Sequence, residues 1–174
     1  MHVADEGIVF SGTAGGDASS ATFPMLCVTS TGRWLCAFRA APSKLRNAGE
    51  RVCLTWSDDM GRRWHDPIEA FHPPRLDGKP GTLRICGITA IHDGSLLAVM
   101  NWVDASVPGL PYFNETTEGL LDTRILASRS EDDGRTWSPV VPSALPHPSA
   151  RFHIRRLRSG RLMLVKHGGL KEQT

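Results

Sequence analysis

The chain has 174 residues, of which 40% are hydrophobic and 22% are charged, a composition typical of a soluble globular protein. Its formal charge of +2 is too small to favour binding to nucleic acid or to a membrane surface. No stretch is apolar over the length needed to span a bilayer, and no basic N-terminal region precedes an apolar run, so we expect a cytoplasmic protein.

The N-terminal third of the sequence predicts a first unit over residues 22–72. A glycine-rich lead-in precedes it, with residues 8–10 as a candidate short strand. Apolar, β-prone runs at 23–30 and 34–41 flank Thr31-Gly32, which is typical of a hairpin turn. An alternating strand at 51–57 and a fourth strand near 64–71 complete four strands in meander order.

The same order returns in a second unit over residues 82–142 and begins again in a partial third unit over 150–174. Strands are predicted at 83–92, 95–103, 123–130 and 137–141, with a long loop over about 104–121, and then at 151–158 and 161–167. The hairpin glycines Gly32, Gly94 and Gly160 lie 62 and 66 residues apart. This regular spacing indicates an array of similar supersecondary units.

A motif with fixed spacing, Ser-x-Asp-x-Gly-x-(Arg/Thr)-Trp, supports the same conclusion because it occurs once in each complete unit. Its Asp can accept hydrogen bonds from the backbone of its own turn, its Gly supplies a positive φ, and its Trp packs beside the turn. The neighbouring Asp58 and Asp133 are expected to be solvated turn charges. The motif residues are Ser57, Asp59, Gly61 and Trp64, and then Ser130, Asp132, Gly134 and Trp137.

These two copies resemble the Asp-box, or BNR repeat, of the sialidase superfamily, whose members are β-propellers. The resemblance covers most of residues 22–168. It implies an all-β, partial β-propeller with about two and a half blades of a six-bladed ring. It also implies an exo-glycosidase that acts on a glycan and needs neither a cofactor nor a metal ion. In that superfamily the Asp-boxes lie on the outer rim, so the motif residues are expected to be structural.

The resemblance breaks at two positions. Sialidases carry an Arg in a Phe/Tyr-Arg-Ile-Pro motif, where it grips the sialic acid carboxylate, and alignment on Pro24 puts Thr22 in its place. A hydroxyl cannot replace a bidentate guanidinium. The loop that should hold the acid/base Asp has only Glu50 as a carboxylate. The alternatives to a hydrolase are therefore a non-catalytic carbohydrate-binding propeller or a scaffold.

Ligands of propellers bind at one mouth of the channel, so the candidate site combines residues at the corresponding ends of the units. Asp104 is the candidate catalytic carboxylate, because glycoside hydrolysis ordinarily uses two carboxyl groups, and Glu115 or Glu118 could supply the second. Cationic and aromatic side chains suit a carbohydrate ligand. The candidate substrate-binding residues are Arg39, Arg84, Trp102, Tyr112 and His167.

The four cysteines form no CxxC pair, so the sequence predicts no zinc site. A two-residue turn at Thr31-Gly32 would place Cys27 opposite Cys36, a geometry compatible with a disulfide, although reduced thiols are the expectation in the cytoplasm. Two and a half blades cannot close a ring. The open strand edges therefore predict either a longer propeller or self-association of copies.

Overall fold

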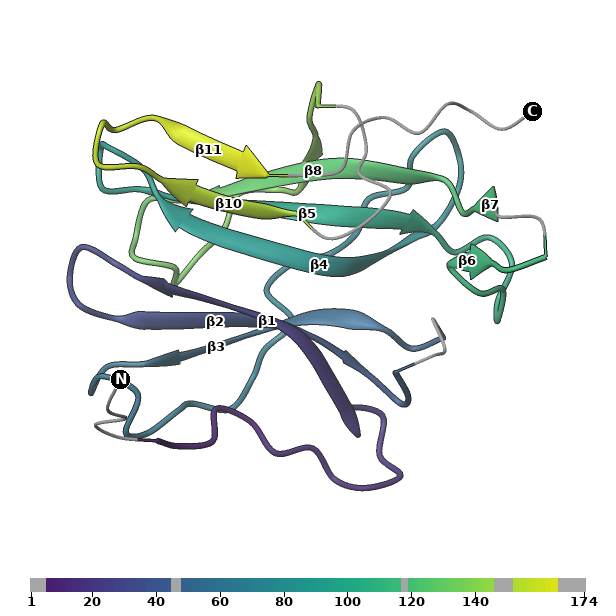
Figure 1. The fold of residues 1–174 in the computed structure, drawn as a ribbon, viewed down its shortest axis with the longest axis horizontal. Helices are drawn as coiled ribbons and strands as arrows, with labels where there is room; N and C mark the ends of the chain where they lie inside the picture. The colour runs from purple at the N-terminus through teal and green to yellow at the C-terminus, as the bar shows by residue number, and fades with distance from the viewer. Residues whose placement is uncertain (1–5, 45–47, 117–118, 146–151, 166–174) are drawn as a thin grey trace.

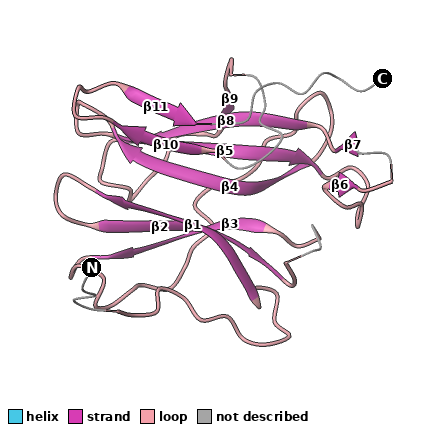
Figure 2. Cartoon of the chain, viewed as in Figure 1, coloured by secondary structure: helices cyan, strands magenta, loops and turns pink. Residues whose placement is uncertain are grey.

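The computed structural model describes residues 6–44, 48–116, 119–145 and 152–165, and every regular element in these ranges is a β-strand (Figure 2). None of these residues forms a helix long and apolar enough to cross a membrane. The strands are β1 Ser20–Val28, β2 Trp34–Ala41, β3 Arg51–Ser57, β4 Gly81–Ala90, β5 Leu96–Asp104, β6 Phe113–Asn114, β7 Gly119–Leu120, β8 Thr123–Ser130, β9 Val141–Pro142, β10 His153–Arg156 and β11 Leu162–Val165.

Two antiparallel sheets lie face to face, and a hairpin packs on the far side of the second one (Figure 1). The first sheet has the order β1-β2-β3, and the second has the order β4-β5-β8-β9. The largest core cluster lies between them, with Leu35 and Ala37 of β2 against Leu96, Ala98 and Met100 of β5. The third hairpin, β10–β11, packs Phe152 and Ile154 onto a smaller cluster on the opposite face of the second sheet.

The predicted strands at 34–41, 51–57 and 123–130 are confirmed with their boundaries. Those predicted at 23–30, 83–92 and 95–103 are confirmed with boundaries shifted by one to three residues, as β1, β4 and β5. The predicted fourth strands are wrong in extent. In the first unit only a bridge between Leu54 and Ile68 remains, and in the second unit only β9 pairs with β8. Pro67 precedes the bridge and Pro139 precedes β9, and a proline cannot donate to a sheet ladder. The short hairpin β6–β7 in the long loop was not predicted.

The lead-in before β1 contains no strand between residues 6 and 19, so the predicted strand at 8–10 is wrong. Instead, Val9, Phe10 and Ala18 pack against the outer face of the first sheet. The Phe10 ring stacks on Phe38 with ring centroids 5.0 Å apart. This segment therefore covers a sheet face rather than adding a strand.

The first hairpin has a three-residue loop, not the two-residue turn that the sequence suggested. The Thr29 N–H donates to the Arg33 carbonyl at 2.8 Å, and Gly32 has a φ of 89°. This is the three-residue geometry in which a left-handed glycine closes the loop. The hairpins closed by Gly94 and Gly160 repeat it, with N–H donation from Ile91 to Ser95 and from Leu157 to Arg161.

The extra loop residue shifts the strand register by one, so the predicted pairing of Cys27 with Cys36 is wrong. Cys27 lies opposite Leu35, and Cys36 lies opposite Leu26. A shift of one residue turns a side chain to the other face of the sheet, and the two thiols accordingly belong to different core clusters. All four cysteines are free and buried.

Candidate functional site

The two motif turns have the same hydrogen bonds. The Ser57 hydroxyl donates to Asp59 and accepts the Gly61 N–H, both at 2.8 Å, and Asp59 accepts the Arg63 N–H at 2.8 Å. The second turn repeats these contacts at 2.9, 2.9 and 2.8 Å with Ser130, Asp132, Gly134 and Thr136. Hydrogen bonds from the hydroxyl and the N–H of Thr136 lower the pKa of Asp132 to about 2.

The tryptophans that end the motifs pack differently. The Trp64 indole N–H donates to the Gly61 carbonyl at 3.1 Å. Trp137 lies edge-on to Phe71, with centroids 5.0 Å apart, and its buried N–H has no partner among the described residues. The Trp137 ring of the second turn therefore packs against the core between the two sheets.

Asp58 is solvent-exposed, as the sequence suggested, although it is also ion-paired, whereas the side chain of Asp133 is only 12% exposed. Arg33 forms an ion pair with Asp58 at 2.7 Å and approaches Asp133 at 3.9 Å. The Thr31 hydroxyl donates to Asp133 at 2.5 Å. Because Thr31 and Arg33 belong to the first hairpin and Asp133 to the second motif turn, these contacts tie the two units together.

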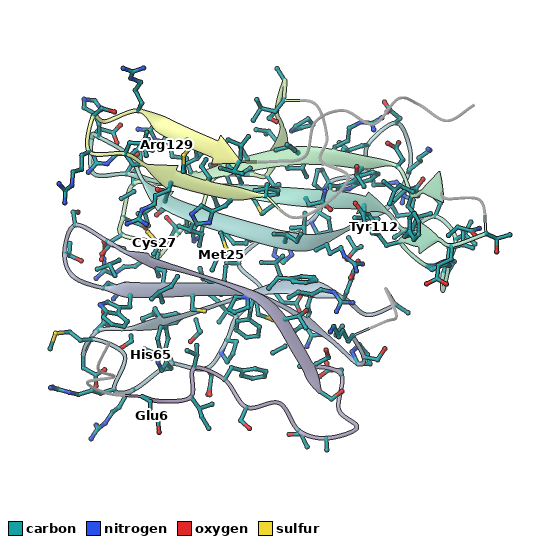
Figure 3. The ribbon with its side chains drawn as sticks, in the orientation of Figure 1. Glu6, Met25, Cys27, His65, Tyr112 and Arg129 are labelled. Atoms are coloured by element: carbon teal, nitrogen blue, oxygen red, sulfur yellow. The ribbon has the colours of Figure 1, made fainter. Side chains whose placement is uncertain are left out.

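These turns lie at the hairpin end of the sheets, since Trp34 at the start of β2 pairs with Ser57. The candidate site lies at the other end, where Ala40 pairs with Arg51 and the long loop begins. Figure 3 shows Tyr112 and Cys27 at these opposite ends. The motif turns are therefore remote from the candidate site.

At the long-loop end, Glu50 joins two arginines from different sheets. Arg39 of β2 donates to its carboxylate at 2.6 Å, and neither side chain is exposed. Arg84 of β4 contacts the same oxygen at 3.2 Å. Burial raises the pKa of Glu50, and the guanidinium groups of Arg84 and Arg39 oppose that rise. Among the described residues, the other carboxylate oxygen of Glu50 has no hydrogen-bond partner.

A β-bulge directs Arg84 into this junction. Arg84 is the extra residue between Leu83 and Ile85, which pair with consecutive residues of β5. Bulges re-aim side chains and are common beside functional sites. The guanidinium carbon of Arg84 lies 4.7 Å from the centre of the Tyr112 ring, a cation–π contact that joins the long loop to the ion pair.

The inner strand of the first sheet has a bulge at the corresponding position, between Thr22 and Met25. Within it Phe23 has a φ of 57°, which is unusual for a bulky residue. Thr22 pairs directly with Arg39. The position at which the sialidase resemblance expects an arginine is thus next to a buried arginine on the adjacent strand.

A cleft of about 430 Å³ separates the two units at this end. It is lined by residues 48–52, 69, 71, 73, 81–83, 103–105, 107–110 and 121. Asp104 is the carboxylate on its second-unit wall and accepts the Ser106 N–H at 2.8 Å. Hydrogen bonds from Ser106, with a further contribution from Lys79 at 3.3 Å, lower the pKa of Asp104. Asp104 is therefore ionised at neutral pH, which suits a base or an acceptor rather than a proton donor.

The structure brings Arg39, Arg84 and Tyr112 together around Glu50. Trp102 is not part of this group, because its side chain is buried in the hydrophobic core. Trp102 is 1% exposed, donates its indole N–H to the Pro74 carbonyl at 3.0 Å, and packs so tightly on Gly81 that no side chain would fit there. No face of its ring is open to a sugar. His167 and Glu118 lie outside the described residues, and Glu115 is exposed on the long loop.

Sequence reasoning missed Asn101, the true counterpart of Arg39. Arg39 lies seven residues after its hairpin glycine, and so does Asn101, whereas Trp102 lies eight after and faces the other way. Asn101 is 1% exposed, and both polar atoms of its amide lack a partner in the described part of the chain. An exact count from Gly94 would have identified it.

The sequence and the fold of the chain were compared with those of known proteins. No protein-family model and no curated protein sequence matches the chain. Solved structures do match. The Hadza microbial sialidase Hz136 superposes with a TM-score of 0.65 at 17% identity, over 84% of this chain and 32% of its own. A variant of the NanB sialidase from Streptococcus pneumoniae gives 0.64 at 15% identity, over 92% and 42%.

A third match is the α-L-arabinanase of Penicillium chrysogenum complexed with arabinobiose, with a TM-score of 0.55 at 12% identity, over 82% of this chain and 38% of its own. The chain thus spans between about a third and two-fifths of the length of these glycosidases. At such identities the likeness establishes the fold alone. The chain therefore has the all-β fold of the sialidase-like β-propellers, as a partial and unclosed array of their sheets.

Proposed function

We propose that the chain is part of a glycoside hydrolase of sialidase-like fold, and that its glycan binds in the cleft between the first and second units. The observation that carries this proposal is the position of the ionised Asp104 on the wall of a cleft that Glu50 also lines. The glycosidases among the structural neighbours support the same reaction class, whereas the motif pair supports only the fold.

Two parts of the site have distinct roles in this proposal. Asp104 is the carboxylate that activates water or stabilises positive charge developing on the sugar ring, as one member of a hydrolytic pair does. Tyr112 and Arg84 do not line the cleft, but Arg84 contacts Glu50, which does. The two side chains offer an aromatic face and a guanidinium to a glycan that extends beyond the cleft. Arg39 and Glu50 are fully buried and act as positioning residues that hold Arg84.

The test is turnover of a panel of fluorogenic glycosides, including a sialoside and an arabinoside, together with calorimetric binding of the matching free glycans. For the substrate that is turned over, Asp104→Asn should lower kcat by about a hundredfold or more, because it removes a charge that acts in the transition state. Glycan affinity should change little. Asp66→Asn is the matched control, since Asp66 is exposed and lies in the connection after the first motif turn.

Turnover that is unchanged in Asp104→Asn would remove this residue from the mechanism. Binding without turnover of any substrate would leave a carbohydrate-binding propeller. Neither binding nor turnover would refute the proposal and leave the scaffold alternative.

A further inference from the structure

The charge of the chain is divided unevenly along its length. Residues 143–174 contain seven Lys and Arg but a single Glu, whereas residues 1–142 contain 13 Lys and Arg and 17 Asp and Glu. The formal charge is therefore +6 at the C-terminal end and −4 over the first two units, although the total is only +2. Such asymmetry between parts of a chain points to an interaction surface.

The positive charge is displayed on the third hairpin. Arg155, Arg156, Arg158 and Arg161 are all exposed. None of them forms an ion pair within the described residues, whereas arginines of the first two units pair with Asp17, Asp58, Glu50, Glu69, Asp93 and Asp122. The cations of the third hairpin are thus available to a partner.

The outer face of this hairpin also exposes aliphatic side chains. Arg155 lies opposite Met163, and His153 lies opposite Val165. Met163 is 37% exposed and Val165 is 54% exposed, while the intervening Ile154 is buried against the second sheet. Arginine and methionine beside exposed aliphatic groups are characteristic of protein–protein interfaces.

The repeat shows what such a face ordinarily does. Met163 and Val165 lie three and five residues after the hairpin glycine. At these two positions the first unit has Leu35 and Ala37, which pack against the second sheet. The second unit has Leu97 and Val99, which pack against the third hairpin. In the third hairpin alone, the corresponding side chains are exposed.

We propose that the outer face of the third hairpin, formed by His153, Arg155, Met163 and Val165 with Arg158 at its loop, docks a second copy of this chain. The second copy presents its first two units, whose formal charge is −4, so the association is head-to-tail. Charge complementarity within one chain favours this occupant, and the exposed aliphatic groups favour a protein over a polyanion. This inference goes beyond the proposed hydrolase and does not depend on it.

A groove of about 590 Å³ extends the docking surface toward the first sheet. It is lined by residues 24–28, 88–90 and 153–156. Leu26 and Val28 on the edge of β1 are 53% and 50% exposed. Figure 1 shows β10 and β1 on either side of β4. A second copy seated on the hairpin would reach these side chains too.

Sedimentation velocity of the full chain tests the proposal, from low micromolar concentration to about 0.2 mM. We expect reversible self-association that weakens by about tenfold or more between about 0.05 M and about 0.5 M NaCl, because screening reduces the attraction between the charged surfaces. Arg155→Glu combined with Arg158→Glu should raise the dissociation constant at least about tenfold. Met163→Ser should raise it with little change in its salt dependence.

The matched control is Arg62→Glu with Arg63→Glu, which makes the same charge change at exposed positions of the first motif turn. Because this turn belongs to the first unit, whose negative charge the proposal uses, the control should not raise the dissociation constant. Circular dichroism and thermal unfolding establish that each variant is folded. A monomer at every concentration would overturn the proposal, as would association that the Arg155 and Arg158 reversals do not weaken. Retention on heparin or DNA by a chain that stays monomeric would assign the surface to a polyanion instead.

Discussion

Replacing Glu50 by glutamine should test whether the buried ion pair holds the two sheets together at the candidate site. The substitution keeps the size of the side chain but removes its charge, and Arg39 would then be a buried cation with no opposing charge at 2.6 Å. Removing one partner of a buried pair costs about 3–5 kcal/mol. We expect a loss of about 3 kcal/mol in the free energy of unfolding, because the amide oxygen can still accept one hydrogen bond.

Urea denaturation followed by tryptophan fluorescence measures this loss. With a denaturant dependence of about 2 kcal/mol per molar urea, the midpoint should fall by about 1.5 M. Glu69→Gln is the matched control, since Glu69 pairs with Arg51 at 2.8 Å but is 53% exposed. Such surface pairs contribute about 0–1 kcal/mol. A midpoint for Glu50→Gln equal to that of Glu69→Gln would refute the reasoning.

Four further predictions concern the turns and the thiols. Gly94→Ala should lower the free energy of unfolding by about 1–2 kcal/mol. The added methyl group would meet no neighbouring atom, so the loss reflects only the backbone strain of an alanine at a φ of 86°. Gly134→Ala should cost about 1–3 kcal/mol more in the same denaturation assay, because the added carbon would lie 2.7 Å from a leucine methyl group. The lowered pKa of Asp132 contributes stability above about pH 4 that is lost as the pH falls toward 2. Unfolding at a series of pH values should therefore show the stability difference between wild type and Asp132→Asn shrinking over that range. A thiol reagent should react with all four cysteines in denaturant and with none in the folded protein, where all four are buried. Burial also raises the pKa of Cys36 to about 11. Reaction of only two cysteines in denaturant without reductant would reveal a disulfide.

The candidate site was only partly predictable, because its members come from separate elements. Arg39, Arg84 and Tyr112 could be selected from the sequence by their type and their position in the repeat. Their common partner Glu50 was noticed only as a carboxylate in a loop, since nothing local indicates that it will be buried between two arginines. The protonation state of Asp104 depends on Ser106, which is two residues away in the chain, but also on Lys79, which only the fold brings to it.

Local sequence determined the repeat, the strands and the two motif turns, because these depend on alternation, on glycine and on hydrogen bonds within a few residues. The loop length of the first hairpin was not determined in this way, and the one-residue error that followed placed Cys27 opposite the wrong partner. The same kind of offset put Trp102 in the site and left out Asn101. Side chains alternate between faces at every residue of a strand, so a site built from strands requires an exact register. That register is set by loop geometry, by bulges and by sheet packing, which only the tertiary structure decided.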